Sequence, residues 1–353
     1  MKLVSYEILG DLGRIESIGA LVDDKIIDLN MGYATYLKKE EGEADPYRMA
    51  DARVPPRMIS FLEGEEKSME AARKTVDYIN GYMKKGETPL DPKGKKLVYN
   101  SNEVKLLAPV PRPNSLRDWL CFEEHLEMAP EKIVAKIPMG TMGKRIYELI
   151  NRFGIKPLMK FFFGIPACYK GNPCTVIGPD DDIWWPDWEG VNLDYECELG
   201  MYIGKKGKDI PLEETSKYIA GYTIFNDVSE RAMEMKEIMR TLGPVKGKDF
   251  DHGNVTGPCM VTPDELDFKS IKTTVRINGE VQVEGYTKDM VWSWEQLIEH
   301  ASKSMTLYPG DLFGSGTIGR GCGIDIGRTL KVGDVIEIEA TGIGILRNRV
   351  VKP

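Results

Sequence analysis

The chain has 353 residues and a formal net charge of -8, from 47 basic and 55 acidic side chains. Its lysines and arginines are scattered rather than gathered in one stripe, which argues against a protein that binds the phosphate backbone of nucleic acid. An acidic protein that takes an anionic substrate needs a metal ion or local basic groups to reverse its own field. We therefore expect a small-molecule ligand and no nucleic-acid partner.

The N-terminal sequence and the cysteines predict a cytoplasmic protein. The start, MKLVSYEILG, has no apolar run long enough for a signal peptide. No segment approaches the length of a membrane span, so no membrane partner is expected. The six cysteines form no CxxC pair, which in a chain of this size favours buried free thiols over disulfides or a zinc site.

The first hundred residues predict a small β-rich unit followed by a linker. The runs KLVSYEILG and SIGALVDDKIIDLN are typical of short strands, joined at Asp23. A helix is expected from about Ile59 to Met83, where apolar and charged positions mix. The following LLAPVPRP indicates an extended linker, because proline disfavours helix in the residue before it. We place a domain boundary there, between residues 1–108 and residues 109–353.

The second unit begins with helical patterns and continues with strands. Asp118 to Met128 is expected to be helical at least in part, and residues 130–161 are apolar but broken by proline and glycine. We interpret residues 130–161 as a lid insertion of two short helices. From Cys174 onward β-patterns dominate, and VRINGEVQV contains an Asn-Gly turn between alternating runs, which is typical of a hairpin. The expected fold class is mainly β, or α+β.

Three acidic residues alternate along LDYECELG. In a strand, residues two apart share a face, so Asp194, Glu196 and Glu198 would project together. The alternative is an acidic stripe that faces solvent. The chain contains a comparison for it, since Glu337 and Glu339 form a second Glu-x-Glu in an ordinary amphipathic pattern. Glu-x-Glu alone therefore leaves both interpretations open.

Asp227 follows the apolar run YTIFN and precedes a helix expected from Ser229 to Leu242. A carboxylate there suits a ligand, but it equally suits a helix N-cap, because Asp227 and Glu230 have the spacing of a capping box. Carboxylates that converge on one point repel one another unless they are protonated or bridged by a cation. Oxygen ligands without His or Cys favour Mg²⁺, Mn²⁺ or Ca²⁺ over zinc.

Further candidates are polar residues in the same segments. Asp118 and His125 are seven apart, so a helix would place them on one face, and the pKa of histidine suits proton transfer near neutrality. A lone histidine is also a common surface residue. Arg231 and Glu234 have the spacing of a routine helix-surface pair. Lys248 follows a glycine and either contacts an anion or is solvated.

Taken in chain order, these segments resemble the fumarylacetoacetate hydrolase superfamily, and especially bacterial members. The matching segments are RDWLCFEEH from Arg117, PACYKGNPCTVIGP from Pro166, LDYECELGMYIGKKGKDI from Leu193, IAGYTIFNDVSER from Ile219, LGPVKGKDF from Leu242, GSGTIG from Gly314 and LKVGDVIEIEATGIGIL from Leu330. The N-terminal KLVSYE and IGALVDDKIIDL also resemble the opening hairpin of the family. The resemblance covers most of the chain. It implies a small N-terminal β-rich domain, a C-terminal mixed β-roll (sandwich-like, with short flanking helices) that holds the active site, and a homodimer.

The resemblance also implies a metal site and catalytic roles. The residues that match the ligands of a Mg²⁺, Mn²⁺ or Ca²⁺ ion are Asp118, Glu196, Glu198 and Asp227. His125 matches the general base, and the residues that match substrate or oxyanion contacts are Tyr169, Arg231, Lys248 and Thr317. Among these, Arg231 and Lys248 are counted as catalytic, and Tyr169 and Thr317 as substrate-binding.

Three positions depart from the family pattern. Glu234, which we count among the catalytic residues, stands where many relatives have glutamine, and an ionised carboxylate cannot donate a hydrogen bond. Ala232 stands where aspartate is usual. No glutamate near Leu330 aligns with the acid that orients the catalytic histidine, which leaves Glu123, Glu124 and Glu127 as alternatives.

The resemblance implies an enzyme that hydrolyses a C–C bond in an acylpyruvate or 1,3-diketo acid, as in aromatic-compound catabolism. In this hypothesis the metal polarises the chelated carbonyls, His125 takes a proton from the attacking water, and Lys248 and Arg231 help to stabilise the enolate. The alternative is an isomerase, decarboxylase or dehydratase that acts on a 2-oxo acid through the same metal-bound enolate. A third class is an inactive scaffold, and the joint presence of all these residues argues against it.

Overall fold

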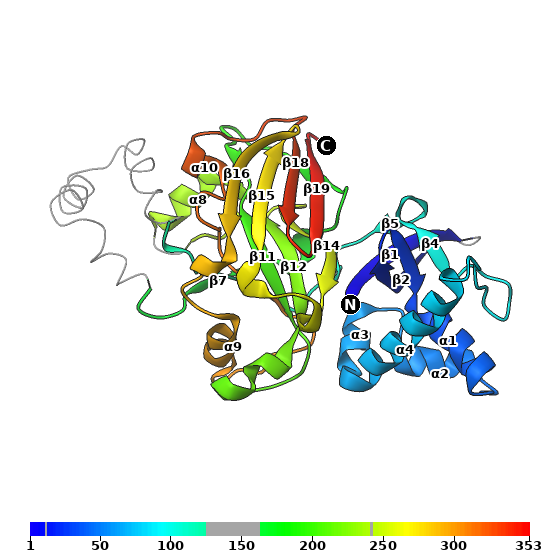
Figure 1. Ribbon diagram of the computed structural model, residues 1–353. Coiled ribbons are helices and arrows are strands. Elements are labelled where there is room, and N and C mark those ends of the chain that lie inside the picture. The colour runs from blue at the N-terminus through cyan, green and yellow to red at the C-terminus, as the bar shows by residue number, and fades with distance from the viewer. Residues whose placement is uncertain (11–12, 125–162, 241–242) are drawn as a thin grey trace, which may run out of the picture.

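A computed structural model describes residues 1–10, 13–124, 163–240 and 243–353 (Figure 1). The lid expected at 130–161 and the candidate base His125 lie outside these ranges. Within the described residues, the strands form a twelve-stranded sheet, a five-stranded sheet and a two-stranded pair. These mixed sheets with few helices confirm the expected fold class.

The N-terminal unit, on the right in Figure 1, combines a small set of strands with a layer of helices. Its strands are β1 (Lys2–Gly10), β2 (Gly13–Val22), β3 (Lys25–Asp28), β4 (Val98–Asn100) and β5 (Lys105–Leu106). Its helices are α1 (Leu29–Glu40), α2 (Pro46–Arg53), α3 (Met58–Glu63) and α4 (Glu65–Met83). The expected turn at Asp23 is confirmed, with φ of 55°. The helix expected from Ile59 to Met83 is two helices that meet at Gly64, and the sequence pattern did not predict α1 and α2.

The remaining elements form the larger unit. Its strands are β6 (Leu116–Trp119), β7 (Cys168–Gly171), β8 (Val176–Ile177), β9 (Asp182–Trp184), β10 (Leu193–Asp194), β11 (Cys197–Ile203), β12 (Ile219–Asp227), β13 (Ser229–Glu230), β14 (Asn254–Val261), β15 (Lys272–Ile277), β16 (Glu280–Tyr286), β17 (Leu312–Gly314), β18 (Val335–Ala340) and β19 (Gly344–Val351). Its helices are α8 (Arg231–Ile238), α9 (Trp294–Ser302) and α10 (Gly323–Ile326).

The two units share one sheet. The long sheet runs in the order β4-β3-β2-β1-β14-β12-β11-β17-β6-β7, so the N-terminal strand β1 pairs with β14 of the larger unit. This pairing joins Lys2 to Val261 and Leu3 to Met260. The segment between β5 and β6 has no helix or strand, as expected for an extended linker. The domain boundary at residues 108 and 109 stays a prediction.

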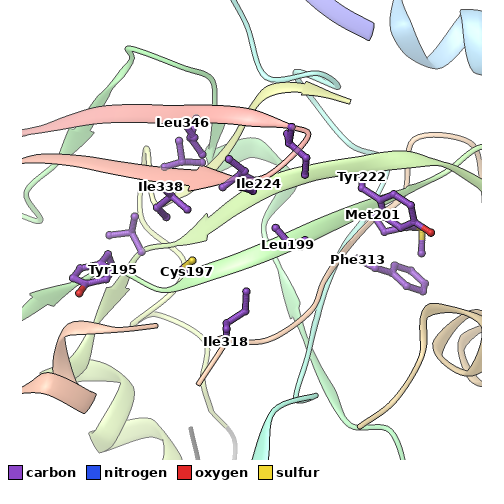
Figure 2. Packing of buried hydrophobic residues seen from close by; sticks show 14 of the residues in the cluster. Tyr195, Cys197, Leu199, Met201, Tyr222, Ile224, Phe313, Ile318, Ile338 and Leu346 are labelled. Carbon is purple, nitrogen blue, oxygen red and sulfur yellow. The ribbon is translucent and has the colours of Figure 1, made fainter. Parts of the chain in front are cut away.

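The main core lies between the long sheet and the five-stranded sheet (Figure 2). Leu199 on β11 and Ile224 on β12 belong to the same buried cluster as Ile338 on β18 and Leu346 on β19. Removing these apolar surfaces from water is the main force that holds the sheets together. Because side chains alternate along β11, burying Leu199 in this core turns its neighbour Glu198 to the opposite face.

The hairpin predicted from Asn-Gly is confirmed. β15 and β16 pair antiparallel, and Asn278 and Gly279 between them have φ of 53° and 81°. Both values lie in the left-handed region that this two-residue turn requires.

The helix expected from Asp118 onward is wrong at its start. Asp118 lies on β6, which is parallel to β17 on one side and antiparallel to β7 on the other. All four residues of β6 are buried. A short run that is buried on both faces has neither the alternation of an exposed strand nor a helical period, so its pattern does not identify it.

The cysteines and helices test the expectations of free, buried thiols and of no membrane span. None of the six cysteines forms a disulfide; Cys121, Cys197, Cys259 and Cys322 are buried, as expected. The prediction of burial is wrong for Cys168 and Cys174, which are exposed. No helix in the described part of the chain combines the length and hydropathy needed to cross a bilayer.

Candidate metal centre and active-site cavity

Neighbouring strands bring four carboxylates to one point. Asp118 lies on β6, Glu198 on β11 and Asp227 at the end of β12, while Glu196 precedes β11. Each of these residues offers one oxygen, and the four oxygens lie within 4.8 Å of one another. All four side chains are buried, so the interpretation of a solvent-facing stripe does not hold for Glu196 and Glu198. The structure thus brings together all four predicted metal ligands, which we call the carboxylate cluster.

The strand conformation is interrupted between β10 and β11, and this separates Asp194 from the cluster. Residues 195 and 196 lie outside both strands, and the backbone N–H of Glu196 donates to Asn226 Oδ1 at 3.1 Å. The expectation that Asp194 shares a face with Glu196 and Glu198 is therefore wrong. The other Glu-x-Glu, Glu337 and Glu339, lies on an ordinary amphipathic strand, as expected. Both side chains are partly exposed on β18 and pair with arginines.

Asp227 is a member of the cluster and not a helix cap. The N-cap of α8 is Glu230, whose carboxylate accepts hydrogen bonds from two backbone N–H groups of the first turn, at 3.2 and 2.8 Å. Helix α8 begins two residues later than the expected Ser229, which belongs to β13. With the cap position filled by Glu230, the side chain of Asp227 is free to face the other carboxylates.

Burial makes the cluster hard to ionise by itself. Desolvation raises the pKa of Asp118 to about 6, and it raises the pKa values of Glu198 and Asp227 well above their ordinary range. The negative charges of the neighbouring carboxylates raise the pKa of Glu198 further. Mutual repulsion of this kind is relieved when a cation lies between the carboxylates.

Two buried oxygens of the cluster have no hydrogen-bond partner among the described residues. They are Glu198 Oε1 and Asp227 Oδ1. Unpaired buried acceptors are rare in folded proteins, and a cation would satisfy both. A ligand set made only of carboxylate oxygens fits Mg²⁺, Mn²⁺ or Ca²⁺. The residues present therefore fit the expected divalent ion.

Two glycines contact the carboxylates in different ways. The N–H of Gly316 donates to Asp118 Oδ1 at 3.2 Å and to Glu198 Oε2 at 3.1 Å. A Cβ at Gly314 would lie 2.3 Å from Asp118 Oδ1 and 2.8 Å from Glu198 Oε2. The GSGTIG segment carries part of the family resemblance, but its sequence did not indicate that Gly314 and Gly316 contact the cluster. The repeated glycine beside a buried strand was the available signal.

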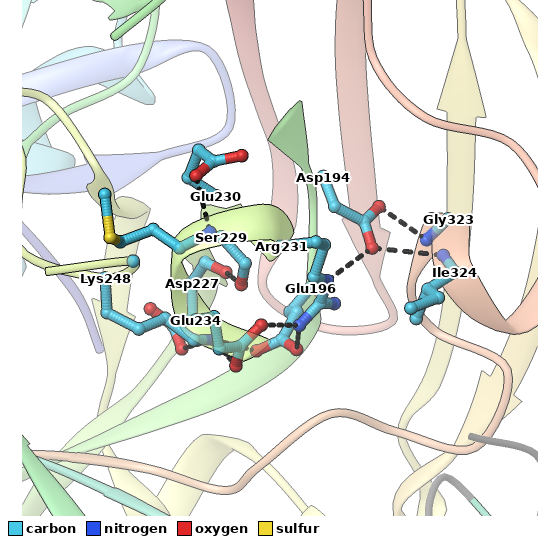
Figure 3. A network of polar contacts seen from close by, with 12 residues as sticks. Asp194, Glu196, Asp227, Ser229, Glu230, Arg231, Glu234, Lys248, Gly323 and Ile324 are labelled. Carbon is cyan, nitrogen blue, oxygen red and sulfur yellow. Dashed lines mark hydrogen bonds and ion pairs between the residues drawn. The ribbon is translucent and has the colours of Figure 1, made fainter. Parts of the chain in front are cut away.

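Two basic side chains flank the cluster (Figure 3). Lys248 Nζ lies 2.5 Å from Glu196 Oε2 and 2.5 Å from Asp227 Oδ2. Arg231 Nη1 lies 2.8 Å from Glu196 Oε1 and 2.9 Å from Glu234 Oε2. Although burial opposes it, the surrounding carboxylates raise the pKa of Lys248 and of Arg231, so both stay protonated. Arg231 and Glu234 are therefore not a surface pair, and Lys248 is not a solvated lysine.

The cluster opens into a cavity of about 390 Å³. Tyr169, Glu234, Lys248 and Thr317 also line it, so these four predicted site residues lie together. The hydroxyl of Tyr169 donates to Asp227 Oδ2 at 2.7 Å. Tyr169 therefore supports a cluster carboxylate, a contact that the sequence did not indicate.

Replacing Tyr169 with Phe is expected to weaken Mn²⁺ binding about tenfold, because groups that orient metal ligands typically contribute at least this much. The matched control is Tyr47→Phe, which removes a similar bond to Asp91 Oδ2, at 3.1 Å, far from the cavity. Titration with Mn²⁺ followed by calorimetry measures both. Equal affinity in Tyr169→Phe and wild type would contradict the supporting role.

Cation binding is expected to weaken as the pH falls through about 6, the pKa of Asp118, because ligands must be ionised to bind. Without a cation, the effect of pH on stability is opposite to its effect on cation binding. A pKa raised by folding means that the folded state binds the proton more tightly, so the apo protein gains stability as the pH falls from neutral toward the unfolded value near 4. Thermal unfolding with chelator or Mn²⁺, at about pH 5 and about pH 7.5, tests this. The rise in Tm on adding Mn²⁺ should be larger at the higher pH; equal rises would contradict the prediction.

Comparisons with known proteins agree with this geometry. Residues 157–351 match the profile of the fumarylacetoacetate (FAA) hydrolase C-terminal domain. An oxaloacetate tautomerase of Bacillus subtilis is 28% identical over 349 residues, which is 97% of this chain and 98% of the relative. A mitochondrial oxaloacetate tautomerase of Xenopus laevis is 30% identical over 306 residues, or 85% and 80% of the two chains.

A solved structure extends the agreement to the fold. The maleylpyruvate hydrolase of Sphingobium sp. SYK-6, in complex with manganese(II) ion and pyruvate, superimposes with a TM-score of 0.63. It is 20% identical, and the match covers 100% of this chain and 99% of that one. The profile match over residues 157–351, together with the relative that is 30% identical over 85% of this chain, establishes that the chain belongs to the fumarylacetoacetate hydrolase superfamily of enzymes.

Proposed function

We propose that the protein is a divalent-metal-dependent tautomerase that interconverts the enol and keto forms of a 2-oxo acid of the oxaloacetate type. The observation that carries the proposal is the buried carboxylate cluster, which opens into a cavity beside Lys248 and has two oxygens without a hydrogen-bond partner among the described residues. Similarity to an oxaloacetate tautomerase over 97% of the chain supports the choice of reaction. This proposal corresponds to the isomerase alternative of the sequence analysis and not to its main hypothesis, a C–C hydrolase.

A bound Mg²⁺ or Mn²⁺ would polarise the carbonyl oxygen of a chelating 2-oxo acid and so acidify the protons on C3. Lys248 and Arg231 hold positive charge beside the cluster, where negative charge develops on the substrate oxygen. Lys248 is held between two carboxylates that keep it protonated. It therefore acts as a fixed donor and electrostatic partner, and not as the base.

Tautomerisation moves one proton between C3 and the carbonyl oxygen, so it needs a group that can accept and return a proton. The resemblance gives this role to His125, which lies outside the described residues. Among the described residues, Glu234 lines the cavity without belonging to the carboxylate cluster. We propose Glu234 as the second candidate for the proton carrier.

The test follows the enol absorbance of oxaloacetate with purified protein, with Mg²⁺ or Mn²⁺ and with chelator. A tautomerase accelerates the loss of the enol only with the cation, and the product keeps its carbon skeleton. Release of two smaller acids, with ¹⁸O from labelled water in a carboxylate, would reject the tautomerase in favour of a hydrolase. No cation-dependent reaction with oxaloacetate or with acylpyruvates would reject both.

A C–C hydrolase of acylpyruvates is the second candidate. It is favoured by the fold match to a maleylpyruvate hydrolase that holds manganese and pyruvate, since pyruvate is a product of such cleavage. The same cluster, Lys248 and Arg231 would serve this reaction, with a water as the added reactant. A panel of acylpyruvates, with quantification of released pyruvate, decides between the two.

We also propose, from the family resemblance, that the enzyme is a cytoplasmic homodimer that takes a small oxo-acid substrate. Light scattering coupled to size-exclusion chromatography measures the dimer directly. A mass near that of one chain, 39.7 kDa, at micromolar concentration would reject it.

A further inference from the structure

Asp194 is a buried carboxylate near the cluster but does not belong to it. It is fully buried, and its two oxygens accept four hydrogen bonds. Figure 3 shows those from Gly323, Ile324 and Arg231. Oδ1 accepts from the N–H groups of Tyr195 and Gly323, at 2.9 and 2.7 Å. Oδ2 accepts from the N–H of Ile324 at 3.0 Å and from Nε of Arg231 at 2.9 Å. Because these donors satisfy it, Asp194 has no need of a metal ion.

The bond to Nε fixes the plane of the Arg231 guanidinium. The guanidinium is a rigid planar fork, so holding Nε on Asp194 determines where its two terminal nitrogens point. Nη1 then lies between Glu196 and Glu234, at 2.8 and 2.9 Å. Nη2 is buried and has no hydrogen-bond partner among the described residues. Without the bond to Asp194, a rotated guanidinium could offer Nη2 to the same carboxylates, so Asp194 selects one of two arrangements.

The selected arrangement sets the orientation of a cluster carboxylate. Glu196 has one oxygen on Arg231 Nη1 and the other on Lys248 Nζ. We infer that Asp194 is a positioning residue: it holds Arg231 so that Glu196 keeps the orientation needed to bind the cation. The inference rests on the cation site of the proposed function. It also gives a role to the first acid of LDYECELG, which the cluster itself leaves out.

The test is a double-mutant cycle on Mn²⁺ affinity, measured by calorimetric titration. Asp194→Asn keeps the size of the side chain but turns a donor NH₂ toward one of its present donors. We expect it to weaken Mn²⁺ binding about tenfold or more, as for other groups that orient metal ligands. In an Arg231→Met background, the same change should cost less than about twofold, because the group through which Asp194 acts is already gone.

The matched control for a merely structural effect is Asp28→Asn. Asp28 is also a buried aspartate that accepts several hydrogen bonds, from Tyr6, Ser17 and the N–H of Met31, but it lies in the N-terminal unit. Its replacement should lower Tm and leave Mn²⁺ affinity unchanged. If Asp194→Asn behaves in the same way, Asp194 is structural and the inference is overturned.

The remaining outcomes are also decisive. An equal loss of affinity in the wild-type and Arg231→Met backgrounds would mean that Asp194 acts by its charge alone, which also overturns the inference. Should Asp194→Asn not fold, Arg231→Lys replaces it, since a single ammonium cannot serve Asp194 and Glu196 together. The expected loss is again about tenfold, and wild-type affinity would overturn the inference. Wild-type protein that binds no Mn²⁺ would instead remove the proposed function, whereas the other outcomes leave it standing.

Discussion

Replacing Glu198 with Gln is expected to weaken divalent-cation binding about a hundredfold or more and to abolish turnover, because it removes a charged ligand. Glu198 is fully buried, Oε1 has no partner among the described residues, and Oε2 accepts from Gly316. The substitution preserves size but removes one of the four charges that would hold the ion. Mn²⁺ titration and the enol assay measure the two losses.

The same change is expected to leave the apo protein as stable as wild type, or more stable. A buried carboxylate among like charges resists ionisation, as the raised pKa of Glu198 indicates. A neutral amide removes that cost. Thermal unfolding in the presence of chelator measures this effect separately from cation binding.

The chain supplies a control for Glu198→Gln in its second Glu-x-Glu. Glu337 lies on β18, is partly exposed, and pairs with Arg347 at 3.8 Å. Glu337→Gln removes one negative charge from the protein and should change neither Mn²⁺ affinity nor turnover, because exposed pairs contribute little. If both variants bind Mn²⁺ like wild type, the carboxylate cluster is not the cation site.

The second large effect is expected from Gly314→Ala. A Cβ at this position would lie 2.3 Å from Asp118 Oδ1 and 2.8 Å from Glu198 Oε2, which is closer than real contacts allow. Two carboxylates must therefore move. We expect Mn²⁺ affinity to fall by about a hundredfold and stability by about 1–3 kcal/mol, the usual cost of overpacking. Calorimetry and chemical denaturation measure the two quantities.

Gly81→Ala is the matched control for that substitution. Gly81 lies in helix α4, and a Cβ there meets no atom within 4 Å. The change should leave Mn²⁺ affinity unchanged and raise stability by up to about 1 kcal/mol, because alanine is the better helix former. Normal cation affinity in Gly314→Ala would mean that the carboxylates are not held where the structure places them.

The placement of Glu198 opposite the main core was predictable from local alternation. In LDYECELG, Cys197 and Leu199 are buried in the main core, and this places Glu198 on the opposite face. The resemblance to the fumarylacetoacetate hydrolase superfamily supplied the partners that alternation cannot supply, namely Asp118 and Asp227. The hairpin at Asn278 was also predictable, because its turn requires particular residues.

The parts that the sequence did not predict depend on contacts between distant segments. Asp118 was assigned to a helix because a short strand buried between β17 and β7 carries no periodic pattern. Asp194 was expected on the same face as Glu196, but residues 195 and 196 interrupt the strand, and Asp194 accepts from the N–H groups of Gly323 and Ile324 instead of joining the cluster. The role of Gly314 depends on how close two side chains from other strands approach, which no single segment encodes.

The parallel pairing of β6 with β17 also constrains when this site can exist. Asp118 and Gly316, which are joined by a hydrogen bond in the cluster, are 198 residues apart in the chain. During synthesis, the strand that carries Asp118 can therefore pair with β17 only after nearly the whole protein has left the ribosome. The full ligand set of the ion therefore forms only after this long-range strand pairing. We expect the complete site to take up its ion after these strands have paired.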